Sequence, residues 1–276
     1  MAFTAELSSD RTRTVGSRLS FDDVISNVGN HYSPTHGFFR CPFDGVYVFT
    51  VTTHTPYPND CTKSSLQWSS TRLMYDRETV LLGPLTFPAS SRYDSGSSSV
   101  TVALHCKAEK DIYVEAHEAY NFKMNTYGAK LTSFTGFHVN TSVAFSAVLT
   151  QNVTSSGYVI LNRVLTNEGN AYNSSNGVFT CPDDALYMIT WSGTDDDVGN
   201  SYLSLHQNGS SVQWLHHSYT GTTSSTPQTS GTSAQARVMI CSKGDPLQLY
   251  YVRHNSQAIL LSEYTVFTGY RLPNQA

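Results

Sequence analysis

The 27 residues from Val24 to Thr50, VISNVGNHYSPTHGFFRCPFDGVYVFT, are repeated 140 residues later, from Val164 to Thr190, as VLTNEGNAYNSSNGVFTCPDDALYMIT. Twelve of the 27 positions are identical, and no gap is needed to align them. A repeat of this length and separation indicates two copies of one domain rather than a solenoid of small units. What recurs in both copies is expected to belong to the fold, and what occurs in one copy is where a special function is expected.

The repeat extends to the edges of both copies. Ala2–Ala5 corresponds to Ala144–Ala147, and Phe134–Phe137 corresponds to Phe267–Tyr270. The sequence therefore predicts one domain over residues 1–139 and a second over residues 143–276, joined by the short linker 140–142. Each domain is large enough to bury a hydrophobic core.

The charge of the chain is low and balanced. The first copy holds 12 Lys and Arg against 13 Asp and Glu, and the second holds 5 against 8, so the net charges are −1 and −3. The basic stripe of a nucleic-acid-binding protein is missing, and no apolar run approaches the ~20 residues of a membrane span. We therefore expect neither nucleic acid nor membrane insertion.

Secretion is predicted from features that agree with one another. Glycosylation sequons stand at Asn140, Asn152, Asn173 and Asn208, and they matter only in a secretory pathway. Cysteines recur in register, as Cys41 and Cys181 and as Cys106 and Cys241. The domain pattern begins at residue 2 without a signal peptide, so we expect that Met1 was added to a mature chain whose leader was removed.

The alternation of apolar residues predicts an all-β fold. Short runs with a period of two are bounded by Gly, Pro, Asn, Asp and Ser clusters, as in a sandwich or jelly roll. Asn208-Gly209 predicts a tight hairpin, because both residues accept positive φ. Large aromatic residues are expected to fill the cores: Phe39, Tyr47, Phe49, Phe134 and Phe137 in the first copy, and Phe179, Tyr187, Trp191 and Phe267 in the second.

These residues carry a family resemblance. The pattern F-x5-N-x4-Y-x6-F-x5-G-x-Y-x-F, met by Phe21, Asn27, Tyr32, Phe39, Gly45, Tyr47 and Phe49, resembles the signature of the C1q globular head. Phe134–Phe137 is similar to the last strand of that family, and Lys243-Gly244-Asp245 to its turn between two late strands. The second copy departs from the pattern at Leu161, Ala185 and Ile189, and the first has Lys110-Asp111 where Gly-Asp is expected.

The resemblance, to the C1q and tumour necrosis factor superfamily, implies two tandem ten-stranded jelly-roll sandwiches that trimerise. It also implies a binding protein rather than an enzyme, and no catalytic motif contradicts this. Collagen repeats and heptads are missing from the sequence, so the chain looks most like the stand-alone and tandem heads of invertebrates, especially molluscs, which are secreted and lectin-like.

The same resemblance suggests how the cysteines pair. Bridges Cys41–Cys106 and Cys181–Cys241 would be equivalent in the two copies, and each would close a loop of roughly 60 residues, worth about 4 kcal/mol. The rival is Cys41–Cys61, which resembles a spacing seen in complement heads. In the first case Cys61 is left free or pairs with another chain.

An acidic run occurs only in the second copy. Asp195, Asp196 and Asp197 offer adjacent carboxylates, which suit calcium, and members of the family bind calcium. The alternative is a solvated loop without an ion.

A second feature of that copy is the segment from Trp214 to Tyr219. Trp214, His216, His217 and Tyr219 combine rings with polar edges, as a sugar-binding surface requires. The alternative is a strand in which Trp214 and Leu215 turn inward and the two histidines have no role.

The sequence thus predicts a secreted protein that binds glycans or microbial surface molecules, with several heads acting together in a homotrimer or another homo-oligomer. Two alternatives remain open at this point. One is a structural or calcium-responsive extracellular scaffold, and the other is a ligand of the tumour necrosis factor type that engages a protein receptor.

Overall fold

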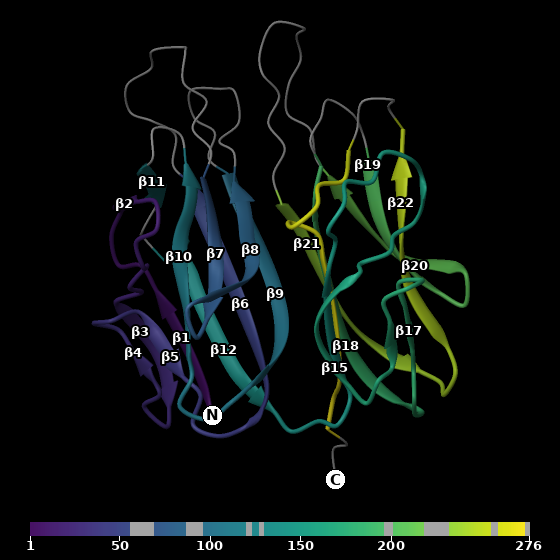
Figure 1. Cartoon of the computed structure of the whole chain (residues 1–276), viewed down its shortest axis with the longest axis horizontal. Helices are drawn as coiled ribbons and strands as arrows, with labels where there is room; N and C mark the ends of the chain where they lie inside the picture. The colour runs from purple at the N-terminus through teal and green to yellow at the C-terminus, as the bar shows by residue number, and fades with distance from the viewer. Residues whose placement is uncertain are drawn as a thin grey trace, which may run out of the picture.

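A computed structural model describes residues 1–55, 69–86, 96–119, 123–126, 130–195, 201–217, 232–254 and 259–273. Strands and turns make up these residues, and none of them forms a helix, let alone one long and apolar enough to cross a membrane. Figure 1 shows two β-sandwiches side by side. The predicted all-β, jelly-roll class is confirmed.

The first sandwich consists of two five-stranded antiparallel sheets, ordered β3-β1-β12-β6-β9 and β4-β5-β10-β7-β8, with β2 and β11 paired beside them. Its strands are β1 (Ala2–Glu6), β2 (Arg11–Thr14), β3 (Asp23–Val28), β4 (Tyr32–Ser33), β5 (Phe38–Arg40), β6 (Gly45–Thr55), β7 (Ser69–Tyr75), β8 (Glu78–Thr86), β9 (Gly96–Cys106), β10 (Asp111–Ala119), β11 (Lys123–Thr126) and β12 (Ser133–Val139).

The second sandwich repeats this arrangement, with sheets ordered β15-β13-β23-β18-β21 and β16-β17-β22-β19-β20, and with β14 paired to β22. Its strands are β13 (Ala144–Val148), β14 (Gly157–Tyr158), β15 (Arg163–Glu168), β16 (Tyr172–Asn173), β17 (Val178–Thr180), β18 (Ala185–Thr194), β19 (Ser201–Gln207), β20 (Ser210–His217), β21 (Thr232–Cys241), β22 (Pro246–Arg253) and β23 (Val266–Arg271). Asn208 and Gly209 join β19 to β20 with φ of 52° and 77°, which confirms the predicted hairpin.

The aromatic residues predicted for the cores are buried in them, with one exception. Phe39, Tyr47, Phe49 and Phe134 lie in one core, and the four predicted residues of the second copy lie in the other. Phe137 is only partly buried and is the exception. Its ring faces Tyr270 of the second domain at 6.5 Å, because odd-numbered and even-numbered residues of β12 face opposite sides of the sheet.

The cysteines behave differently in the two domains. Cys181 and Cys241 form a disulfide, as predicted, across a sequence separation of 60 residues. The equivalent Cys41 and Cys106 are two buried free thiols, so the predicted bridge in the first domain is not formed. The neighbouring Cys41 side chain and burial raise the pKa of Cys106 and keep it protonated, and its thiol donates to the Leu104 carbonyl at 3.7 Å. Cys61 lies outside the described residues.

Candidate functional site

One face of the second domain gathers aromatic side chains. In β19 the alternate residues Leu203 and Leu205 are fully buried in the core, so Tyr202 and His206 point to the opposite side of the sheet. The same alternation turns Leu215 of β20 inward and leaves Trp214 half exposed, at 51%. We call this surface the aromatic face, and it consists of Tyr158, Tyr202, His206, Trp214, Tyr250 and His254.

Three rings form one end of the aromatic face. The Tyr202 ring meets the Trp214 ring edge to face, with centroids 5.8 Å apart and planes at 86°. It meets the exposed His254 ring in the same manner, at 5.3 Å and 88°. Each perpendicular contact covers the face of only one of its two rings, and Trp214 and His254 remain exposed to solvent.

Three further rings form the other end. His206 stacks on Tyr250, with centroids 5.1 Å apart and planes at 14°, and Tyr158 meets both edge on. Burial lowers the pKa of His206, so its imidazole is neutral at physiological pH. Ser204 lies between the two ends, opposite Trp214 in the strand register, with its hydroxyl 3.0 Å from Nε2 of His206.

A cavity adjoins the aromatic face at Tyr158. It is smaller than a second cavity, of about 390 Å³, which strands of both domains line. This smaller cavity has a volume of about 330 Å³. Its lining includes the ring of Tyr158 and the amide side chains of Gln151, Asn152 and Asn162. Amide groups both donate and accept hydrogen bonds, so the cavity adds polar partners beside the rings.

The equivalent face of the first domain is charged. Strand register places Glu115 where the second domain has Tyr250, and Arg72 where it has Ser204. Arg72 and Glu115 form an ion pair of 2.7 Å across these positions. Arg18, which takes the place of Tyr158, lies over the ring of Tyr113 at 3.7 Å. The two domains therefore share the sheet and differ in what its outer face presents.

The sequence found one member of the aromatic face and missed the others. Trp214 is exposed, so the alternative in which it turns inward is wrong, although Leu215 does turn inward. His216 and His217 lie in β20, opposite Tyr202 and Ser201, and Tyr219 is outside the described residues. For two of the missed residues, Tyr202 and His206, the signal was the alternation Tyr-Leu-Ser-Leu-His, which marks one outward face.

Asp195 is a buried structural carboxylate and does not lie in a solvated loop. It is 1% exposed, directly after β18. Its oxygens accept hydrogen bonds from the Ser201 hydroxyl, from the Tyr251 hydroxyl at 2.9 Å and from the Ile259 amide at 3.1 Å. Burial and this carboxylate raise the pKa of Tyr251.

The rest of the acidic run is not placed. Asp196 and Asp197 lie outside the described residues. Within the part of the chain that the structure describes, no three His, Cys, Asp or Glu side chains gather as metal ligands. Calcium binding stays a prediction.

The four sequon asparagines, Asn140, Asn152, Asn173 and Asn208, are all exposed. Asn208 sits at the tip of the β19–β20 hairpin, where its Nδ2 donates to Asp245 at 3.0 Å. Asn173 accepts from the amide and hydroxyl of Ser175. Exposure makes these sites accessible, and their use as glycosylation sites stays a prediction.

The sequence was compared with known families and structures. The C1q domain matches twice, over residues 2–139 and 144–272. The chain is similar to the globular domain of a zebrafish complement 1qA protein, with 19% identity, a TM-score of 0.40, and coverage of 50% of this chain and 96% of that one. It is also similar to Eiger TNF from S. frugiperda, with 18% identity, a TM-score of 0.36, and coverage of 49% and 89%. For murine APRIL the identity is 14%, the TM-score 0.36, and the coverage 47% and 98%.

Proposed function

This chain belongs to the C1q-domain family, and we propose that it is a secreted recognition protein that binds carbohydrate through the aromatic face of its second domain. Proteins with this domain act in recognition and innate immunity or as ligands like tumour necrosis factor. They are usually extracellular, are generally not enzymes, and typically form homotrimers. Within these classes, the surface chemistry of the two domains favours a carbohydrate ligand.

The observation that carries the proposal is the contrast between two equivalent faces. In the first domain the outer sheet presents the Arg72–Glu115 ion pair, and in the second it presents uncharged rings around Tyr202 and Tyr250. Sugars offer apolar C–H faces and hydroxyl edges, which fit ring faces and neutral polar groups better than fixed ion pairs. Tyr202 and His206 are four residues apart in one strand, about 13 Å, so both ends of the aromatic face can contact one extended ligand.

The test is a glycan array probed with the full chain, followed by titration of the best ligand. We expect Trp214→Ala and Tyr202→Ala each to weaken binding about tenfold or more, since about 1.4 kcal/mol of contact energy is lost per tenfold change. Phe43→Ala is the matched control, because Phe43 is a 39% exposed ring in the first domain. Binding that the Trp214 and Tyr202 variants retain in full would contradict the assignment of the site.

Repeating the glycan-binding measurement with a chelator tests whether recognition requires calcium. We expect glycan binding to be unchanged by chelator, because the carboxylate of Asp195 already accepts three hydrogen bonds within the protein. Loss of binding on chelation would place a calcium ion in the recognition mechanism instead. Absence of binding to any glycan would favour the scaffold or the receptor ligand over a lectin.

A further inference from the structure

The cavity beside the aromatic face is framed by two segments of the second domain. Residues 149–153 form one wall, and their backbone bonds to residues 260–265 through hydrogen bonds of 2.7 to 3.0 Å. Residues 158–162 form the other wall, where the Val159 amide donates to the Leu249 carbonyl at 2.9 Å. The volume of about 330 Å³ lies within the range of small-molecule sites, so the cavity has room for one sugar residue.

Two asparagines in these walls have their carbonyl oxygens bound by the protein itself. Oδ1 of Asn152 accepts from the Ser262 amide at 2.8 Å, and Oδ1 of Asn162 accepts from the Thr150 hydroxyl at 2.7 Å. A backbone amide can only donate, so the contact with Ser262 fixes which way the Asn152 side chain is turned. In the part of the chain that the structure describes, neither Nδ2 donates to another group.

Apolar side chains lie beside these two donors. Leu149 is buried, Val153 is partly buried and Ile160 is 45% exposed, and all three line the cavity. None of the described residues that line it is charged. An ionised ligand group would lose hydration there without meeting an opposite charge, which disfavours a carboxylate or a sulfate. The cavity therefore suits an uncharged group that combines a hydrogen-bond acceptor with a small apolar part.

In the first domain a carboxylate takes the place of Asn162. The strand register aligns that asparagine with Asp22. Asp22 accepts from the amide and the hydroxyl of Ser8, at 3.1 and 2.7 Å, and forms an ion pair with Arg11 at 2.8 Å. An ionised carboxylate has no proton to donate, so the donor at this position belongs to the second domain alone.

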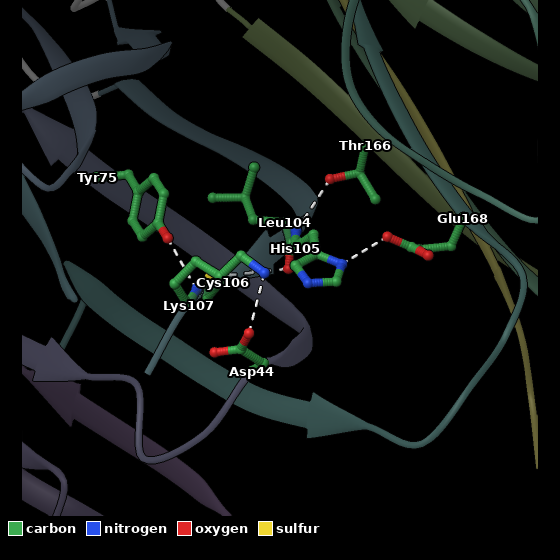
Figure 2. Close-up of polar contacts among 8 residues, drawn as sticks. All are labelled: Asp44, Tyr75, Leu104, His105, Cys106, Lys107, Thr166 and Glu168. Atoms are coloured by element: carbon green, nitrogen blue, oxygen red, sulfur yellow. Dashed lines mark hydrogen bonds and ion pairs between the residues drawn. The ribbon is translucent and has the colours of Figure 1, made fainter. Parts of the chain in front are cut away.

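The polar groups where the two domains meet differ from these asparagines, because they are already paired. Figure 2 shows His105 of the first domain with its Nδ1 2.5 Å from a carboxylate oxygen of Glu168 in the second. Next to it, Lys107 pairs with Asp44 at 2.9 Å, and the Lys107 amide donates to the Tyr75 hydroxyl at 2.8 Å. These groups stabilise contacts within the protein, whereas the two Nδ2 groups at the cavity remain for a ligand.

We propose that the cavity binds the acetamido group of an N-acetylhexosamine residue, an inference that rests on the carbohydrate binding proposed for the aromatic face. The acetamido carbonyl accepts from Nδ2 of Asn152 and Asn162, and the methyl group packs against Ile160. Tyr158 lines the cavity, and its ring meets that of Tyr250 in the aromatic face at 5.0 Å. One residue of a glycan therefore occupies the cavity while its neighbours extend over the rings.

The proposal has a consequence for the sequon Asn152-Val153-Thr154. A glycan of the protein's own would be attached to Nδ2 of Asn152, which is one of the two donors. It would also take up space at the mouth of the cavity. Ligand binding and glycosylation of Asn152 therefore exclude each other, and the binding form of the protein has this asparagine unmodified.

The experiment is titration calorimetry of the full chain with chitotriose and with cellotriose. These trisaccharides share one linkage and differ in the acetamido group that chitotriose carries on each ring in place of a hydroxyl. The protein is produced in the bacterial periplasm, where the sequon stays unmodified and the disulfide can form. We expect chitotriose to bind about tenfold more tightly than cellotriose, as one or two further hydrogen bonds allow.

Two variants test the donors directly. Asn152→Asp and Asn162→Asp keep the size of the side chain and the oxygen that the protein uses, and they remove the donor. Each should weaken chitotriose binding about tenfold and leave cellotriose binding unchanged. Asn170→Asp is the matched control, because it adds the same charge at an exposed asparagine in the turn before β16, outside the cavity. Near-UV circular dichroism checks that each variant is folded, and either Asp variant alone suffices for the test.

The outcomes separate this inference from the proposed function. Equal affinities of wild type for the two sugars, both weakened by Trp214→Ala, would support the aromatic face and overturn the acetamido site. A preference for chitotriose that both Asp variants retain would also overturn it. Tighter binding of a galacturonic acid trisaccharide than of chitotriose would make a carboxylate the recognised group. If neither chitotriose nor cellotriose binds, the acetamido site is wrong, and the glycan array still decides whether the aromatic face binds another carbohydrate.

Discussion

At the scale of single residues, the motif asparagine and tyrosine form one clamp in each domain. Asn27 Nδ2 donates to the Tyr32 carbonyl, and its Oδ1 accepts from the Tyr32 amide. Asn167 does the same for Tyr172, at 2.9 and 3.0 Å. Each tyrosine hydroxyl then donates to a backbone carbonyl in the core. The spacing of four residues between Asn and Tyr is thus a requirement of turn geometry.

Gly136 and Gly269 lie at equivalent positions in β12 and β23, the last strands of the two domains, where the packing leaves no room for a side chain. A Cβ on either glycine would lie 2.5 Å from the ring of Phe3 or Phe145, respectively. Only glycine lets the strand pass this close to a buried phenyl ring. The glycine therefore recurs in both domains because a phenyl ring packs directly against the strand at this position.

The first prediction concerns the clamp. Asn167→Ala should destabilise the second domain by about 1–3 kcal/mol, because a backbone donor and an acceptor lose their partner together. Urea unfolding monitored by tryptophan fluorescence measures this. Asn162→Ala is the control, since Asn162 is exposed and makes one side-chain hydrogen bond, and it should change stability by no more than about 0.5 kcal/mol. Equal losses in the two variants would show that the clamp adds nothing specific.

The second prediction concerns pH. Burial lowers the pKa of His206, so the unfolded chain binds a proton at a pH where the folded domain does not. The stability that the neutral imidazole contributes is fully present above its unfolded pKa of about 6.5, and is lost as the pH falls through the lowered folded value. Wild type should lose more stability than His206→Gln between about pH 7.5 and about pH 5 in urea unfolding. The same loss in both proteins would contradict this.

At the scale of strands, the two domains hold equivalent edges together in different ways. The end of β21 is joined through Cys241 to Cys181, which follows β17, whereas the equivalent Cys106 and Cys41 are two buried free thiols. The backbone hydrogen bonds around the cysteines are the same in both domains. The Cys41 amide donates to a carbonyl in the turn before β10, and the Cys181 amide donates to one in the turn before β22. The fold therefore fixes the position of both pairs, and one pair is covalent.

The third prediction follows from that difference. Replacing Cys181 and Cys241 by Ala should cost the second domain about 4 kcal/mol, the chain-entropy value for a loop of 60 residues. The matched variant, with Cys41 and Cys106 replaced by Ala, removes no bridge and should cost less. Thermal unfolding without reductant compares the two. Equal losses, together with a Cys41–Cys106 peptide in non-reducing mass spectrometry, would show that the first pair is also oxidised.

At the scale of the whole molecule, the two domains are joined by more than their linker. Arg163 Nη1 donates to the Val80 carbonyl at 3.1 Å, and Val148 and Val266 of the second domain belong to the apolar cluster of the first. Ala103 is fully buried at the centre of the contact. Because apolar side chains of both domains are buried against one another, we expect the domains to unfold as a coupled pair.

The fourth prediction is that Ala103→Glu separates the two domains. A carboxylate without a partner in this apolar contact should weaken coupling by roughly 3 kcal/mol or more. Differential scanning calorimetry should then resolve two transitions, and the linker from Asn140 to Ser142 should become cleavable by protease. Val238→Glu, the equivalent position on exposed β21, is the control and should leave the coupling unchanged. A single unshifted transition in Ala103→Glu would contradict the prediction.

The sequence by itself determined what depends on local pattern and on repetition. Alternating apolar residues define strands wherever they lie, so the all-β class, the Asn208-Gly209 hairpin and most core rings could be predicted. The family resemblance added the Cys181–Cys241 bridge, which is confirmed, and the equivalent Cys41–Cys106 bridge, which is not formed.

Only the tertiary structure decided which residues of different strands meet. The aromatic face joins β14, β22 and the β19–β20 hairpin, and β22 pairs with β14 and with β19 over long sequence separations. Phe137 looked like a core residue until the second domain was placed against it, and Asp195 looked solvated until Ser201, Tyr251 and Ile259 enclosed it. The alternation of apolar and polar residues predicts the side of the strand on which a side chain lies. Its neighbours on adjacent strands depend on pairing between segments that are distant in sequence. Those pairings placed the rings together on the surface and made β21 the last strand of its sheet.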